Sequence, residues 1–171
     1  MNVFDFAMKM EMDGKAYYEK LARETSLAGL QTIFTRLAED EQKHYEIFKM
    51  LQTSGKVPAM QESTALAEAR NVFADLLKGA AVAMGSKDDL TAYRQAMKLE
   101  ADSFRLYADA AAKETAAAVK SLLLKVAEEE HKHFNILENI YQFVNAPNQY
   151  LAWGEFSNLE EFRQFGRQVD A

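Results

Sequence analysis

Glu41 and His44 are the residues whose types and spacing first suggest chemistry in this sequence. On an α-helix, residues at positions i and i+3 lie one turn apart on the same face. That face is otherwise apolar, with Leu37 before the pair and Phe48 after it, so we expect it to be buried. Because an ionised carboxylate is very costly to bury without a partner, a metal ion held by the carboxylate and the imidazole is the obvious explanation.

The same pattern occurs a second time, 89 residues further along the chain, at Glu130 and His133. The same offset, with no gap, relates three further pairs: Glu11 with Glu100, Tyr18 with Tyr107, and Ala38 with Ala127. The sequence is therefore a tandem duplication of a two-helix unit. Each unit contains an isolated Glu, a Tyr and a Glu-x-x-His.

Helical periodicity predicts the elements that must position these residues. Four long helices are expected: 2–24, 27–53, 88–114 and 115–145. The short links within each half make two antiparallel hairpins. The connection at 54–87, with a helical middle within 61–83, is long enough to cross a bundle from end to end. We therefore predict an all-α fold, a four-helix bundle built from two duplicated helix hairpins joined by a long crossover.

The bundle is expected to occupy residues 1–146 as one domain. A chain of 171 residues that is 49% hydrophobic can bury a core, and its scarcity of Gly and Pro favours helices. Residues 147–171 are predicted to form an aromatic-rich tail with a short helix near the C-terminus. We expect the aromatic side chains of this tail to cover the bundle or a subunit interface.

Packed as a bundle, the four long helices would each turn one acid inward at a similar depth. The six candidate ligands are Glu11, Glu41, His44, Glu100, Glu130 and His133. A Glu from each of two helices with a Glu-x-x-His from each of the other two is the arrangement of di-iron and di-manganese bundles. Oxygen and imidazole ligands suit Fe(II) or Mn(II), and four carboxylates neutralise two divalent ions. The alternative is buried acids that pair with Lys or Arg or face a wet groove, but too few basic residues lie in register to pair them all.

The composition excludes several other kinds of site. The absence of cysteine rules out disulfides, thiolate zinc sites, iron–sulfur clusters and a rubredoxin-type iron centre on this chain. The net charge of −6 argues against non-specific binding to nucleic acid. Neither a signal-peptide pattern nor an apolar run approaching the ~20 residues of a membrane span is visible. We therefore expect a cytoplasmic protein without a membrane partner.

The motifs around the candidate ligands resemble the rubrerythrin branch of the ferritin-like superfamily, over roughly residues 3–145. The resemblance implies two iron ions as the cofactor, or manganese or a mixed pair in their place. It implies that Glu41 and Glu130 bridge the two metals. The remaining ligands would form two pairs: Glu11 with His44, and Glu100 with His133. Tyr18 and Tyr107 would either hydrogen-bond to a ligand Glu or pack in the core.

The sequence departs from the family pattern in two ways. Full-length rubrerythrins carry a rubredoxin domain as an electron relay, and this chain has no cysteine to build one, so an external electron-donor protein is expected as a partner. Many members also have an extra ligand Glu one turn after the isolated Glu of the second unit. Here that position is Ser103, with Gly14 as its counterpart in the first unit. We expect a homodimer, and the long connection leaves room for an exchange of hairpins between its chains.

By this resemblance, the leading interpretation is a di-iron protein that reduces hydrogen peroxide or dioxygen with electrons from an external donor. The candidate catalytic residues are Glu41, Glu130, Tyr18 and Tyr107. One alternative is a ferroxidase or iron-handling protein, for which Fe(II) is the substrate. Another is a non-enzymatic helical interaction module with a vestigial metal site, against which the intact ligands in both units argue.

A further histidine, His131, lies three residues after Glu128 and so makes a third Glu-x-x-His. It lies off the apolar stripe and has no equivalent in the first unit. We therefore expect His131 to be a surface residue rather than a ligand. The acids around these motifs are expected to form a solvated face: Glu39, Asp40, Glu128 and Glu129.

Overall fold

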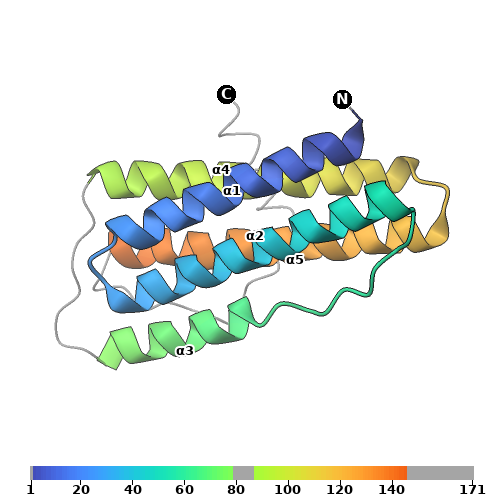
Figure 1. Ribbon diagram of the computed structural model, residues 1–171. Helices are drawn as coiled ribbons and strands as arrows, with labels where there is room; N and C mark the ends of the chain where they lie inside the picture. Colours follow the sequence, from blue (N-terminus) through green and yellow to red (C-terminus); the bar gives the residue numbers. More distant parts are fainter. Residues whose placement is uncertain (1, 79–86, 146–171) are drawn as a thin grey trace.

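Four long helices form the bundle, and each copy of the duplicated unit supplies two of them (Figure 1). The computed structural model describes residues 2–78 and 87–145. Within those residues the helices are α1 (Val3–Glu24), α2 (Ala28–Ser54), α3 (Ala65–Lys78), α4 (Lys87–Lys113) and α5 (Ala117–Asn145). The predicted all-α fold is confirmed as a ferritin-like helical bundle. The short helix predicted within 147–171 lies outside the described residues.

The two hairpins pack side by side. α1 packs along α2, and α4 packs along α5, while α1 also contacts α4 and α2 contacts α5. In Figure 1 the chain returns along the length of the bundle after α2, so that α4 begins at the same end as α2. The two halves therefore face each other with equivalent helices adjacent, which is what brings duplicated residues together.

α3 is the helical middle of the crossover, as predicted, and it lies against α2 and α5 on the side of the bundle away from α1 and α4 (Figure 1). Gly29 of α2 permits the close approach of α3. A Cβ atom at this position would lie 2.6 Å from Cγ1 of Val72, which is too close for any side chain. α5 is therefore in contact with three helices, α2, α3 and α4.

Capping residues mark the start of α1 and the end of α2. The side chain of Asn2 accepts a hydrogen bond from the Asp5 backbone N–H at 2.9 Å, and the Asp5 carboxylate accepts one from the Asn2 N–H at 3.3 Å, which forms a capping box at the start of α1. α2 ends at Ser54, and the residue that caps it, Gly55, has a φ of 66° in the left-handed region. Glycine adopts that conformation at no steric cost.

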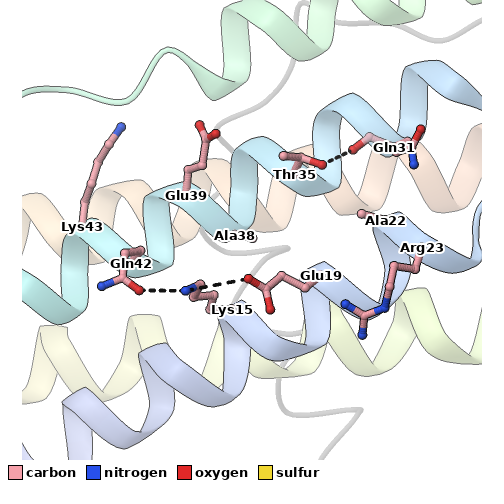
Figure 2. Close-up of a pocket in the computed structure, with 10 residues that line it drawn as sticks. All are labelled: Lys15, Glu19, Ala22, Arg23, Gln31, Thr35, Ala38, Glu39, Gln42 and Lys43. Carbon is pink, nitrogen blue, oxygen red and sulfur yellow. Dashed lines mark hydrogen bonds and ion pairs between the residues drawn. The ribbon is translucent and has the colours of Figure 1, made fainter.

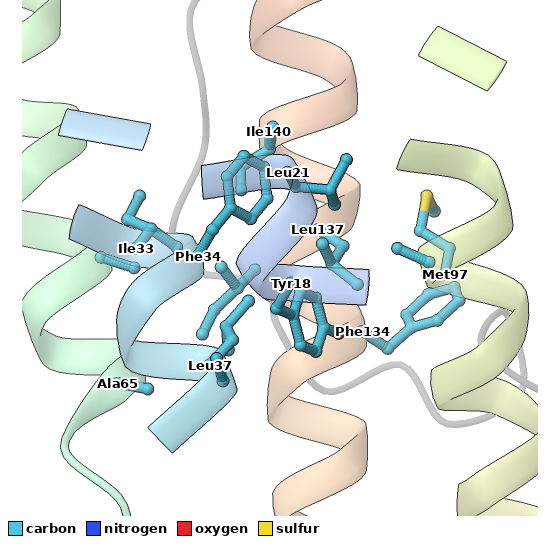
Figure 3. Packing of buried hydrophobic residues seen from close by; sticks show 14 of the residues in the cluster. Tyr18, Leu21, Ile33, Phe34, Leu37, Ala65, Met97, Phe134, Leu137 and Ile140 are labelled. Atoms are coloured by element: carbon cyan, nitrogen blue, oxygen red, sulfur yellow. The ribbon is translucent and has the colours of Figure 1, made fainter. Parts of the chain in front are cut away.

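Apolar stripes of the long helices fill the bundle on both sides of its middle. On α2, Phe34 and Leu37 precede the Glu-x-x-His motif and Phe48 follows it, and all three are fully buried. Figure 3 shows part of this core, in which Leu21 of α1, Phe34 of α2, Met97 of α4 and Leu137 of α5 point to one interior. Full burial of a side chain of this size contributes about 1.5–3 kcal/mol. Apolar contacts thus supply the frame that holds the polar middle.

The outward faces of the bundle are polar. Lys9 and Asp13 on α1 form an ion pair of 2.7 Å, and the equivalent residues Lys98 and Asp102 on α4 form one of 2.8 Å. The first pair is exposed and the second half-buried, and ion pairs near the surface contribute little to stability. Among the described helices, none combines the length and the apolarity that crossing a membrane needs.

Candidate metal centre

All six predicted ligands meet in the middle of the bundle. Their ligand atoms form two groups, each within 4.8 Å: Glu11, Glu41, His44 and Glu130, and then Glu41, Glu100, Glu130 and His133. Glu41 and Glu130 belong to both groups, and every member is buried. These two residues therefore lie where the two groups meet.

Glu130 divides its two oxygens between the two histidines. Its Oε1 lies 3.3 Å from His44 Nδ1, and its Oε2 lies 3.4 Å from His133 Nδ1. His44 Nδ1 also lies 3.4 Å from Glu11 Oε2, and His133 Nδ1 lies 3.1 Å from Glu41 Oε1. Both imidazoles thus turn Nδ1 toward the carboxylates, so that one oxygen of Glu130 is available to each group.

Several polar atoms at this centre have no hydrogen-bond partner among the residues that the structure describes. They are Glu11 Oε2, His44 Nδ1 and both carboxylate oxygens of Glu130. A buried polar atom without a partner is rare and costs free energy. Cations between the carboxylates would satisfy these atoms at once, and oxygen with imidazole nitrogen is a donor set that divalent iron and manganese accept. The residues therefore fit a pair of divalent metal ions.

The charges of the cluster are strongly coupled. Burial raises the pKa of Glu11 and Glu100 well above the usual range, and repulsion by Glu130 raises it further. Burial would lower the pKa of His44 and His133, but the surrounding carboxylates raise it well above its ordinary value. The cluster thus favours bound protons wherever no other cation compensates its carboxylates, so metal binding would release protons.

The second nitrogen of each histidine contacts a carboxylate from the other half of the molecule. His44 Nε2 lies 2.9 Å from Glu129 Oε2, and His133 Nε2 lies 3.2 Å from Asp40 Oδ2. Such carboxylates fix the ring orientation of a metal-binding histidine. Asp40 and Glu129 are only 1% and 5% exposed, so their assignment to a solvated face is wrong, whereas Glu39 is exposed as predicted. The missed signal is that both occupy the same position of the repeat, directly before the Glu of Glu-x-x-His.

The two tyrosines also contact the opposite half. The Tyr18 hydroxyl donates to Glu100 Oε1, and the Tyr107 hydroxyl donates to Glu11 Oε1. Both side chains are buried, so each packs in the core and also holds one oxygen of a candidate ligand. Burial, together with repulsion by Glu11, raises the pKa of Tyr107 well above its usual value, so its hydroxyl keeps the proton that it donates.

His131 is not a surface residue, contrary to the prediction. It is 5% exposed, and its ring lies 6.0 Å from that of Phe104 between centroids. Burial lowers its pKa. The physical reason is that the His131 ring packs toward α4, against Phe104, so that a side chain off the apolar stripe of α5 is still enclosed. His131 belongs to neither of the two ligand groups found among the described residues.

Two cavities differ in their relation to this centre. A wide one of about 700 Å³ lies on the outer side of the α1–α2 hairpin, where Lys15 contacts Gln42 and Glu19 (Figure 2), and none of the six ligands lines it. A small one of about 60 Å³ is bounded by Glu41 and Glu100 as well as by Gly14 and Ser103. A Cβ atom on Gly14 would lie 3.2 Å from Glu41 Oε2. The small side chains at these two positions therefore leave space directly beside the carboxylates.

The family model described as Rubrerythrin matches residues 2–141, which span both duplicated units and all six ligands. No curated protein and no solved structure matched the chain.

Proposed function

The chain belongs to the rubrerythrin family, and we propose that it is a non-haem di-iron protein that reduces hydrogen peroxide, or dioxygen, with electrons from an external donor protein. The observation that supports this most directly is the pair of ligand groups that share Glu41 and Glu130. Two iron ions, when bound, supply the reversible two-electron change that converts one peroxide and two protons to two waters. Manganese or a mixed pair would occupy the same ligands.

In this proposal, the residues of the chain hold the reacting centre in one geometry. Asp40 and Glu129 orient the two imidazoles through Nε2, which leaves Nδ1 directed at the carboxylates. Tyr18 and Tyr107 each restrain one carboxylate oxygen of a ligand from the other half. The restraints cross between the halves, so that each half holds ligands of the other half in place.

The small cavity beside Glu41 and Glu100 is the proposed place of the oxidant. A water molecule needs roughly 10–15 Å³ of cavity, so a space of about 60 Å³ admits an oxidant of a few atoms, such as hydrogen peroxide. Gly14 and Ser103 keep that space open. Glu41, Glu100 and Tyr18 on its inner side are buried, whereas Asp13 and Leu99 on its outer side are exposed, so that a small oxidant has a route to the carboxylates from the surface.

A turnover assay tests the proposal. Protein loaded with Fe(II) under anaerobic conditions is expected to consume hydrogen peroxide catalytically in the presence of a reductant. Glu130→Ala is expected to abolish this consumption, whereas Glu128→Ala, an exposed acid on the same helix, is expected to leave it unchanged. Net release of Fe(III) without catalytic loss of peroxide would contradict the proposal and favour a ferroxidase.

A further inference from the structure

Ser63 lies in the crossover, two residues before α3 begins, and so outside the paired helices. Its hydroxyl donates to Asp40 Oδ2, and its backbone N–H donates to Glu129 Oε1 at 2.7 Å. Asp40 and Glu129 are the two carboxylates that contact His133 and His44. A single residue of the crossover therefore contacts the outer partner of each histidine.

The local structure fixes the direction of the hydroxyl bond. Ser63 Oγ accepts a hydrogen bond from the Ala65 backbone N–H at 3.1 Å, at the start of α3. A hydroxyl has one proton to donate, and here that proton goes to Asp40. The backbone N–H can only donate, so Glu129 can only accept from Ser63. Both carboxylates thus accept a hydrogen bond from Ser63 of the crossover.

This arrangement determines which nitrogen of each histidine carries the proton. An ionised carboxylate has only acceptor atoms, so it holds the imidazole by accepting the Nε2 proton. When a metal ion takes the place of the Nδ1 proton, the ring keeps its Nε2 proton and offers the lone pair of Nδ1, the atom that both histidines turn toward the candidate ligands. Donors at Ser63 keep both carboxylates in this accepting role.

We propose that Ser63 is a positioning residue, which holds the two histidine rings with Nδ1 directed at the metal positions by way of Asp40 and Glu129. This inference rests on the proposed metal site. Ser63 lies in the crossover, which is not part of the repeat, so a single residue serves both halves.

The two branches from Ser63 differ chemically, which makes the inference testable. Ser63→Ala removes the hydroxyl and so the contact to Asp40, but it keeps the backbone N–H that contacts Glu129. The metal position of His133 is therefore expected to weaken, and that of His44 is not. Since Lys43 Nζ also lies 3.4 Å from Asp40 Oδ1, we expect a loss of about tenfold in affinity, the lower end for removal of such outer partners.

The experiment is an anaerobic Mn(II) titration followed by the electron paramagnetic resonance signal of free Mn(II). It is carried out in two backgrounds that each retain one metal position. In the His44→Ala background, Ser63→Ala is expected to weaken Mn(II) binding about tenfold, and Ser63→Thr, which keeps the hydroxyl, is expected to restore it. In the His133→Ala background, Ser63→Ala is expected to leave the affinity unchanged.

Thr64→Ala is the matched control. Thr64 adjoins Ser63 and contacts Arg36 and Glu68 rather than the buried carboxylates. Its substitution is expected to leave both affinities unchanged while loosening the same segment. Equal effects of Ser63→Ala in the two backgrounds, an equal effect of Thr64→Ala, no effect of Ser63→Ala, or its failure to fold would each overturn the inference. Failure of the wild-type chain to bind Mn(II) would instead overturn the metal site itself.

Discussion

The two duplicated halves contain the same ligands but differ in what surrounds them. His131 in α5 is enclosed, whereas Gln42, its equivalent in α2, is half-buried and contacts Lys15 and Glu46 near the surface. The crossover helix α3 contacts both α2 and α5, so the difference lies in the side chains at these positions: the His131 ring lies against that of Phe104 on α4, whereas Gln42 reaches Lys15 on the outer side of α1. The comparison indicates that the residues common to both halves make the metal centre. Positions that differ between the halves, such as His131 and Gln42, follow the burial of their own half.

The halves also depend on each other. Each histidine and each isolated Glu receives its outer contact from the opposite half, through Asp40, Glu129, Tyr18 and Tyr107. Neither half alone holds a complete set of restraints. Duplication of a hairpin would therefore give a restrained centre only once the two copies had packed together, so we expect metal binding and packing of the halves to be coupled.

The largest effect is expected from removing what both halves share. Binding that is restricted to the folded state stabilises it by about 2.7 kcal/mol when the free metal is at 100 times its Kd, so the melting temperature of the wild type is expected to rise on anaerobic addition of Fe(II) or Mn(II). The double variant Glu41→Ala, Glu130→Ala is expected to abolish this rise, because both ligand groups lose the two carboxylates that they share. The variant is expected to remain folded, since its apolar stripes are intact. A metal-dependent rise that persisted in the variant would contradict the sharing.

Substitution of one histidine is expected to affect one half. His44→Ala and His133→Ala are each expected to lower the metal content from two ions per chain to one, as measured by elemental analysis. His131→Ala is expected to retain two ions but to lose about 1 kcal/mol or more of stability, because it empties a buried site. Gln42→Ala, at the equivalent position of the first half, is the control and should change neither quantity. Loss of metal from His131→Ala would mean that His131, and not His133, is the ligand in the second half.

The pH dependence of stability after chelation tests the charge coupling. Burial would lower the pKa of His44 and His133, but the carboxylates raise it above 6.5. A raised pKa means that the folded state keeps protons that the unfolded chain releases, so this contribution is complete below pH 6.5 and declines as the pH rises through the folded value. Glu11 and Glu100, also raised, act in the same direction. The melting temperature of chelated protein should therefore fall as the pH rises above 6.5, and a melting temperature that rose instead would refute the coupling.

The smallest effects are expected from the tyrosines. Tyr18→Phe and Tyr107→Phe each remove one hydrogen bond to a buried carboxylate at almost constant volume, which costs about 1–3 kcal/mol. Because the contacts cross between the halves, Tyr18→Phe is expected to weaken the metal position of Glu100, and Tyr107→Phe that of Glu11. Calorimetric titration in the two single-histidine backgrounds separates these positions. An effect of Tyr18→Phe on the Glu11 position alone would show that the contacts do not cross.

The repeat predicted the ligands because it reports a spacing that both halves must keep. The same offset that relates Glu11 to Glu100 identified all six residues and the hairpins that carry them. The burial of Asp40, Glu129 and His131 escaped prediction, since the period of a single helix indicates the face toward its main partner but not a second or third contact face. Ser63 could not be found at all, because its contact to Glu129 joins residues 66 apart and depends on the path of the crossover.

A crystal of the Fe(II)-loaded protein, measured at the iron absorption edge, tests the central claim most directly. Two anomalous peaks per chain are predicted, roughly 3.5–4 Å apart as in other two-metal sites, with Glu41 and Glu130 each in contact with both. One peak should adjoin Glu11 and His44, and the other Glu100 and His133. A single peak, or two peaks of which either lacks Glu41 and Glu130 as neighbours, would contradict a centre shared between the halves.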